Sequence, residues 1–95
     1  MAAYAIFQIE VTDPAGYEEY RRTAAATIEQ YGGKYLVRGG NVESLEGDWR
    51  PARIVVLEFE SAERAREWWS SQDYSGPKSI RQRTASSKAI IVEGV

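Results

Sequence analysis

The side chains that could do chemistry in this chain are carboxylates, tyrosines, lysines and arginines, because the sequence contains no histidine and no cysteine. Catalysis by a Ser-His-Asp or Cys-His arrangement is therefore excluded. Thiolate and imidazole metal sites are excluded as well, so only an all-oxygen site could form, and we expect neither a metal nor a cofactor. Acid–base chemistry must come from Asp, Glu, Tyr or Lys with a shifted pKa, or from the substrate itself.

Polar side chains interrupt the apolar strand patterns at four positions: Gln8, Glu10, Arg38 and Glu58. Pairing two strands outward from the loop at 47–52 predicts that residues 41–42 lie near Glu58. Arg38 would then reach Glu58 or Glu60. A partly buried arginine–carboxylate pair is most often structural, but it can also act as a clamp for an anion or a carbonyl group.

An aromatic group and a short basic run follow one another late in the chain. Trp68, Trp69 and Tyr74 are typical of a helix core, but adjacent helical residues point about 100° apart, so one tryptophan must be half exposed or line a cleft. Trp49, in a loop, is another contact candidate. The basic residues Lys78, Arg81 and Arg83 are typical of a solvated segment, and the alternative is one wall of an anion site.

Hydrophobic periodicity and turn signals predict the elements that position these residues. Strands are expected at 3–11, 34–38, 53–59 and 87–92, with 41–46 extending the second strand beyond a bulge or close backbone approach at Gly39-Gly40. One helix begins after Asp13 and ends at Gly32-Gly33; a second begins after Ser61 and runs to about 71. Residues 73–85 are expected to be irregular or a short helical turn, broken by Gly76-Pro77.

The order β-α-β-β-α-β is the ferredoxin-like split βαβ arrangement of the α+β class. It predicts a four-stranded antiparallel sheet with two helices on one face. The strands also carry apolar residues on the other face, as at Ile54, Val56 and Ile90. Such a face needs cover, so we expect a homodimer related by a two-fold axis.

The length and the net charge of the chain limit the classes of protein to which it could belong. The 95 residues are expected to form one domain, 1–95. The net charge of −2 carries no electrostatic footprint for nucleic acid or an anionic membrane. Without a signal-peptide pattern or a long apolar run, a cytoplasmic protein is expected.

Three stretches together resemble one known family. Residues 32–40 read Gly-Gly-Lys-Tyr-Leu-Val-Arg-Gly-Gly, residues 53–59 read Arg-Ile-Val-Val-Leu-Glu-Phe followed by Ser61, and residues 69–74 read Trp-Ser-Ser-Gln-Asp-Tyr. These are similar to the signatures of the domain of unknown function 1330 family, and the match continues to Arg81 and to residues 92–94. Gln72 departs from the pattern, where proline is usual, as does the Trp68-Trp69 pair.

The resemblance implies a dimeric α+β barrel, in which two ferredoxin-like sheets face each other, and no settled activity. Proteins of that fold include cofactor-free oxygenases, haem-degrading enzymes, muconolactone isomerases and stress-responsive barrels, and fold alone does not transfer their chemistry. The positions that the resemblance marks as functional are Arg38, Gly39, Gly40, Glu58, Tyr74 and Arg81.

Two functions are consistent with these residues. The first is binding or conversion of a small organic molecule in the cleft between sheet and helices, by isomerisation, cyclisation or substrate-driven oxygenation. Arg38 would hold an anionic or carbonyl group, and Glu58 would orient it or act as a base. The expected ligand-binding residues are Gly39, Gly40, Trp69, Tyr74 and Arg81. The second function is a non-catalytic dimeric interaction or assembly domain.

Overall fold

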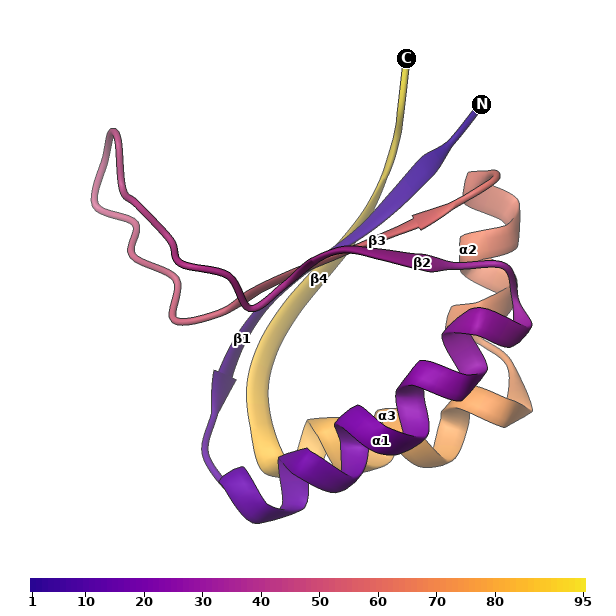
Figure 1. The fold of residues 1–95 in the computed structure, drawn as a ribbon, viewed down its shortest axis with the longest axis horizontal. Coiled ribbons are helices and arrows are strands. Elements are labelled where there is room, and N and C mark those ends of the chain that lie inside the picture. Colours follow the sequence, from indigo (N-terminus) through magenta and orange to yellow (C-terminus); the bar gives the residue numbers. More distant parts are fainter.

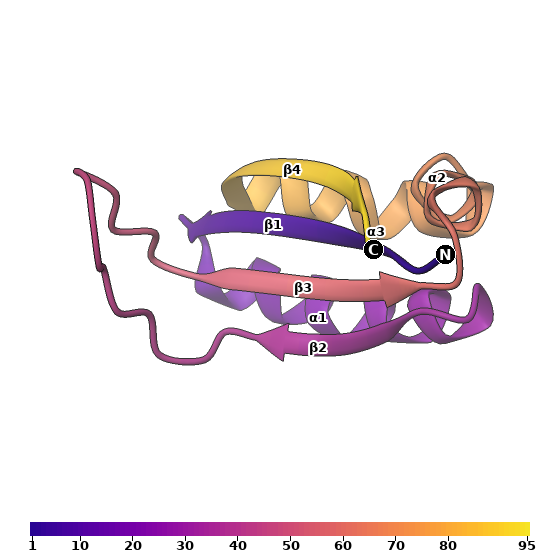
Figure 2. The ribbon, with the colours of Figure 1, turned by 90° about the horizontal axis from the view of Figure 1, so that it is seen from above.

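In the computed structural model, which describes residues 1–95, four strands are combined with three helices. The elements in chain order are β1 (Ala3–Val11), α1 (Pro14–Gln30), β2 (Lys34–Arg38), β3 (Ile54–Phe59), α2 (Ala62–Trp69), α3 (Gln72–Thr84) and β4 (Ala85–Glu93). The strands form one antiparallel sheet in the order β2-β3-β1-β4. All the helices lie on the same face of this sheet (Figures 1 and 2). The ferredoxin-like α+β prediction is therefore confirmed, with one helix more than expected.

Helix α1 begins and ends where local chemistry directs it. Asp13 caps the start by accepting a hydrogen bond from the Gly16 amide at 3.3 Å, and Pro14 occupies the first turn. The chain leaves the helix through Gly32, whose φ of 77° is in the left-handed region that favours glycine. The buried residues recur every three or four positions, so one face packs on the sheet: Tyr17, Tyr20, Ala24, Thr27 and Ile28.

Helix α3 corrects the prediction that residues 73–85 are irregular, since Gln72–Thr84 is a continuous helix that contains Pro77. Ser71 caps it, accepting from the Tyr74 amide at 3.1 Å. Its inner face buries Tyr74, Arg81 and Thr84, at 0%, 2% and 1% exposure. Packing of that face against α1 and the sheet outweighs the cost of an interior proline, because tertiary contacts routinely override helix propensity.

The connection between β2 and β3 also differs from the prediction. Residues 41–46 do not extend the strand; they belong to a long loop that projects from the sheet (Figure 1). The bulge lies between Tyr35 and Val37 rather than at Gly39-Gly40. The Gly39 amide does approach β3 closely, donating to the Ile54 carbonyl at 3.0 Å.

Both faces of the sheet carry apolar residues, as the strand patterns predict. The face under the helices holds the core, and Ala5, Phe7 and Ile9 of β1 are each at most 3% exposed. On the open face, Ile6 lies between Val56 of β3 and Ile90 of β4. Ile90 is 61% exposed and Val92 is 43% exposed, so this chain alone leaves the second face uncovered.

None of the helices combines the length and the apolar character needed to cross a membrane.

Candidate functional site: a buried arginine in a groove beside β4

Arg81 of α3 is the most unusual charged residue in the structure. Its exposure is only 2%, yet no carboxylate lies within ion-pair distance. Both ion pairs lie elsewhere, Arg21 with Glu18 and Arg64 with Glu67. A buried guanidinium without a counter-ion is costly, because the low-dielectric interior disfavours an uncompensated charge.

The Arg81 guanidinium is held in place, but not all of its hydrogen-bond donors have an acceptor. Its Nε donates to the Tyr74 hydroxyl at 3.4 Å, and Nη1 donates to Ser87 Oγ. Its Nη2 is buried and has no hydrogen-bond partner. Three aromatic rings surround the cation at 5.3–5.9 Å from Cζ: Phe7, Trp69 and Tyr20. Cation–π contacts recover part of the lost solvation, but both N–H groups of Nη2 remain without an acceptor.

Arg81 lines one end of a groove between β4 and helices α2 and α3, which we call the Arg81 groove. Its polar half has a volume of about 310 Å³ and is lined by Trp69, Arg81, Gln82, Ala85, Ser87 and Ala89. Its apolar half has a volume of about 250 Å³ and is lined by Ala5, Phe7, Trp68, Trp69, Ala89, Ile90 and Ile91. The halves share Trp69 and Ala89, so a charged end and an apolar end adjoin.

Two tyrosines form the support behind Arg81. The hydroxyls of Tyr20 and Tyr74 are 2.9 Å apart, and Tyr74 is completely buried. Burial raises the pKa of Tyr20 far above its usual range, and the neighbouring Tyr74 adds to the shift. Tyr20 therefore stays protonated and cannot serve as a base. Tyr74 orients Arg81 rather than contacting the groove, so it is a positioning residue.

The two adjacent tryptophans differ in burial, as the geometry of a helix predicts. Trp68 is 1% exposed, and its Nε1 donates to Thr27 Oγ1 at 3.1 Å, so it is a satisfied core residue. Trp69 is half-buried and lines both halves of the groove. Lys78 fixes this residue by donating from Nζ to the Trp69 carbonyl at 2.9 Å.

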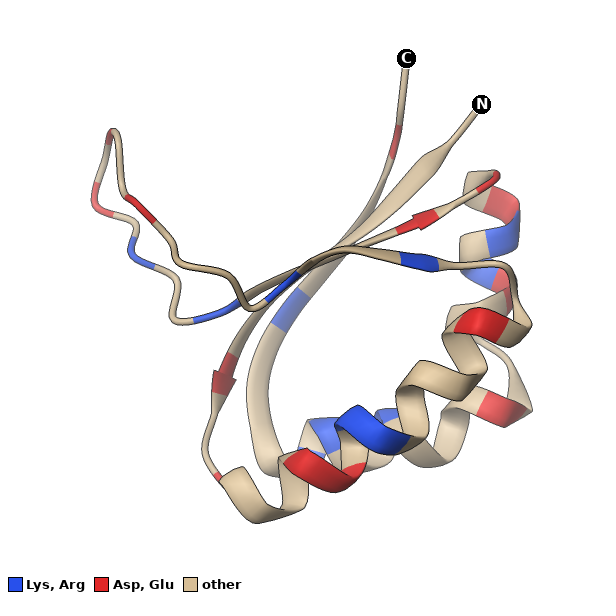
Figure 3. Cartoon of the chain, in the orientation of Figure 1, with Lys and Arg blue, Asp and Glu red and all other residues tan.

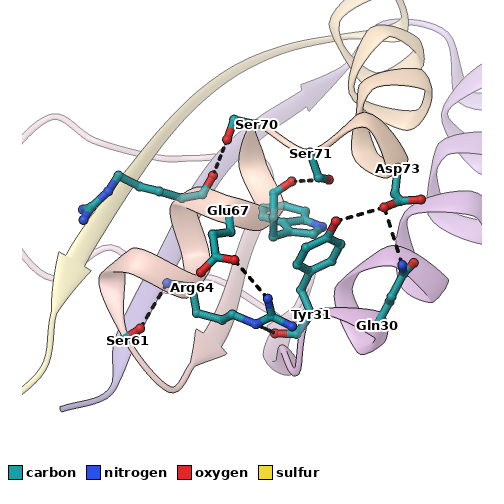
Figure 4. Close-up of polar contacts among 10 residues, drawn as sticks. Gln30, Tyr31, Ser61, Arg64, Glu67, Ser70, Ser71 and Asp73 are labelled. Carbon is teal, nitrogen blue, oxygen red and sulfur yellow. Dashed lines mark hydrogen bonds and ion pairs between the residues drawn. The ribbon is translucent and has the colours of Figure 1, made fainter.

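Contacts between the helices fix the ends of α2 and α3 against α1 (Figure 4). The Tyr31 hydroxyl donates to Asp73 Oδ2 at 2.9 Å, and Arg64 Nε donates to the Tyr31 carbonyl at 3.1 Å. These bonds join the segment after α1 to the start of α3 and to α2. The helices that carry Trp69 and Arg81 are thereby held in a defined position.

The three residues of the basic run point in different directions from helix α3. Arg81 points into the protein, Lys78 bonds to backbone, and Arg83 is exposed. Only Arg81 has the burial and the missing partner that indicate a site.

The predicted pairing of Arg38 with Glu58 is wrong. Arg38 lies opposite Val55 and therefore faces the helices, whereas Glu58 lies opposite Lys34 and Tyr4 on the open face. Val55, the partner of Arg38, also lies three positions before Glu58 along β3, which corresponds to about 10 Å. The bulge after Tyr35 causes this, because one extra residue turns Arg38 to the other side of the sheet. The two residues cannot share a site within one chain.

Of the other predicted site residues, some lie at the Arg81 groove and others lie far from it. Trp69 and Arg81 meet in the groove, and Tyr74 stands behind Arg81. Gly39 lies at the far edge of the sheet beside Arg53, and a methyl group at Gly40 would have no neighbour within 4 Å.

Ser87 is a groove residue that the sequence patterns did not single out. It lies opposite Ile9 of β1, on the face that packs against the helices. A signal was present, because strict alternation through Ala85, Ala89 and Ile91 puts a hydroxyl at an inward position.

The donor set of the groove favours an anion. Both halves lack carboxylates among their lining residues. Across the whole chain, no group of three or more Asp, Glu, His or Cys side chains lies together as metal ligands would.

The fold and the groove define the class: a ferredoxin-like α+β domain with a third helix and a hollow between its helices and an edge strand. The chain belongs to the family described as Domain of unknown function (DUF1330), whose model matches residues 2–95. No curated protein sequence matches the chain.

Solved structures share the fold at low sequence identity. A protein of unknown function from Rhodopseudomonas palustris, RPA0582, has a TM-score of 0.79 at 18% identity, covering 99% of this chain and 82% of its own. SnoaB, a cofactor-independent oxygenase from Streptomyces nogalater, has a TM-score of 0.61 at 11% identity, covering 99% and 91%. A putative antibiotic biosynthesis monooxygenase from Nitrosomonas europaea has a TM-score of 0.65 at 14% identity, covering 100% and 99%.

Replacing Arg81 by methionine tests whether the buried charge serves stability. We expect Arg81→Met to change the free energy of unfolding by no more than about 1 kcal/mol, or to raise it, because an apolar side chain often replaces a buried ion without loss. Urea unfolding followed by circular dichroism measures this. A loss of about 3 kcal/mol or more would show that Arg81 is a structural residue.

Proposed function

We propose that the protein binds a small organic anion with a planar apolar body in the Arg81 groove. Two observations carry this proposal: Arg81 lines the polar end of the groove, and its buried Nη2 has no hydrogen-bond partner. A carboxylate, phenolate or enolate oxygen would accept from Nη2, with Ser87 beside it, and form a charge-assisted hydrogen bond. The body of the ligand would lie against Phe7 and Trp69 in the apolar half.

The same geometry supports conversion of the ligand through its own anion. A fixed cation among aromatic rings stabilises an oxyanion as it forms. With no carboxylate in the groove, the electrons and the acid–base steps would come from the substrate. Isomerisation, cyclisation and cofactor-free oxygenation are reactions of this type. The similarity to SnoaB, itself described as a cofactor-independent oxygenase, is in line with this extension.

Calorimetric titration with benzoate and naphthoate, each beside its neutral amide, tests the binding. We expect the acids to bind at least about tenfold more tightly than the amides, because only an anion compensates Arg81. Arg81→Met should abolish this preference. Arg83→Met is the matched control, since it removes an exposed charge from the same helix. Equal affinities for acid and amide, or equal effects of the two variants, would contradict the proposal.

A second candidate function, dimeric assembly, rests on the open face of the sheet. Ile90 is 61% exposed, Val92 43% and Val37 39%, and they flank the half-buried Ile6 and Val56. We propose that two copies cover these faces with each other, because a contiguous apolar face is rarely left open by a monomer. Assembly and ligand binding meet at Ile90, which is exposed on the open face and also lines the apolar half of the groove, whereas Arg81 and Ser87 lie on the helix side.

Sedimentation at micromolar concentration tests assembly. The chain should sediment as a dimer, and Ile90→Asp should sediment as a monomer, because it buries a charge in the interface. Ser79→Asp places the same charge on the exposed side of α3 and should remain dimeric. A wild-type monomer would refute this second candidate.

A further inference from the structure

A second group of arginines lies at the other edge of the sheet, away from the Arg81 groove. A small cavity of about 20 Å³ between α1 and the β2–β3 pair is lined by Arg21, Arg38 and Arg53. The rest of its lining is aromatic or aliphatic: Phe7, Ile9, Tyr17, Tyr20, Ile28, Tyr35, Val55 and Leu57. We call the three arginines the triple-arginine site. Figure 3 shows basic segments on α1, at the end of β2 and at the base of the following loop.

The charges of this site are not compensated by the protein. Arg38 and Arg53 have no carboxylate within ion-pair distance, and Arg21 contacts only Glu18, at 3.3 Å. That carboxylate is 59% exposed, so solvent weakens the pair. The Nε atoms of Arg21 and Arg53 are buried without hydrogen-bond partners. Three like charges around one cavity repel each other, and a bound anion would remove that repulsion.

Neighbouring residues hold the guanidinium groups in place. Arg38 Cζ lies 4.4 Å from the centroid of the Tyr35 ring, and Arg53 Cζ lies 5.8 Å from that of Tyr17. Gly39, with φ of 75°, makes room for Arg53: a Cβ at this position would lie 2.6 Å from Arg53 Cζ. Gly40 has open space around it, so the two adjacent glycines are not equivalent. Pre-positioned guanidinium groups lose little entropy when they bind an oxyanion.

We propose that the triple-arginine site binds a compact oxyanion with more than one negative charge: a phosphate or sulfate, either free or as the terminal group of a small molecule. The cavity has room for about one water molecule, so it would admit one oxygen of such a group, while the other oxygens and any organic body would stay outside it. Guanidinium groups match phosphate and sulfate oxygens in pairs of hydrogen bonds. This site is independent of the proposed function of the Arg81 groove.

Titration of the full-length chain, followed by ¹⁵N–¹H NMR at constant ionic strength, tests this inference. Inorganic phosphate and sulfate should shift the amides of residues 38–40 and 53 saturably, whereas chloride should not. Phenyl phosphate is the second arm. Tighter binding than phosphate identifies the terminal group of a small molecule as the ligand, and equal or weaker binding identifies the free ion. Absence of saturable shifts with all three oxyanions would overturn the proposal. The arginines would then have only a structural role, shielding the core from solvent.

Variants locate the site. Arg53→Met should weaken phosphate binding at least about tenfold, because a charge-assisted hydrogen bond is lost. Arg50→Met, an exposed charge in the same loop, should leave binding unchanged. If Arg53→Met does not fold, Arg38→Met serves the same purpose, since Arg38 is exposed at a strand end. Equal weakening by Arg50→Met, or loss of phosphate binding in Arg81→Met, would refute the assignment.

The glycine pair provides a control that alters no charge. Gly39→Ala should displace Arg53 and weaken phosphate binding severalfold, while Gly40→Ala should have no effect. Equal affinities in these two variants would show that the position of Arg53 does not matter and would contradict the proposal.

Discussion

The Arg81 guanidinium is a permanent charge that the fold removes from water without supplying a carboxylate. Aromatic rings, one tyrosine hydroxyl and one serine hydroxyl replace its hydration only in part. Such an arrangement costs folding free energy, because the desolvation of an ion exceeds what cation–π contacts return. The folded protein therefore keeps a cation with unpaired N–H groups beside an apolar groove. An anionic ligand would complete the hydrogen bonding that the protein leaves open.

The surrounding structure serves to hold that charge. Antiparallel pairing of β1 with β4 places Phe7 and Ser87 on the face below the helices, where both contact the guanidinium. Helix α3 continues through Pro77, so Tyr74 and Arg81 lie two turns apart on one buried face. The hydrogen bond between Tyr20 and Tyr74 then fixes α3 against α1. The groove is therefore formed by β1 at the start of the chain together with α2, α3 and β4, which follow one another at its end.

Local sequence patterns were sufficient to predict most of the fold. Alternation in β1, the continuous apolar run in β3 and the Asp13 and Gly32 signals around α1 predicted these elements correctly. Helix α3 escaped prediction because two of its three buried residues, Arg81 and Thr84, are polar, and Gly76-Pro77 resembles a break. The Arg38–Glu58 pair failed for a different reason. A bulge of one residue reverses the side to which a strand residue points, and no residue type in β2 indicates it.

The central claim is that Arg81 Nη2 is the anchor for an anionic ligand, and a crystal structure with bound naphthoate tests it most directly. The account predicts a carboxylate oxygen about 3 Å from Nη2, with the rings packed against Trp69. A structure in which Nη2 donates to a carboxylate of a second copy of the chain, while the ligand lies elsewhere or is absent, would contradict it.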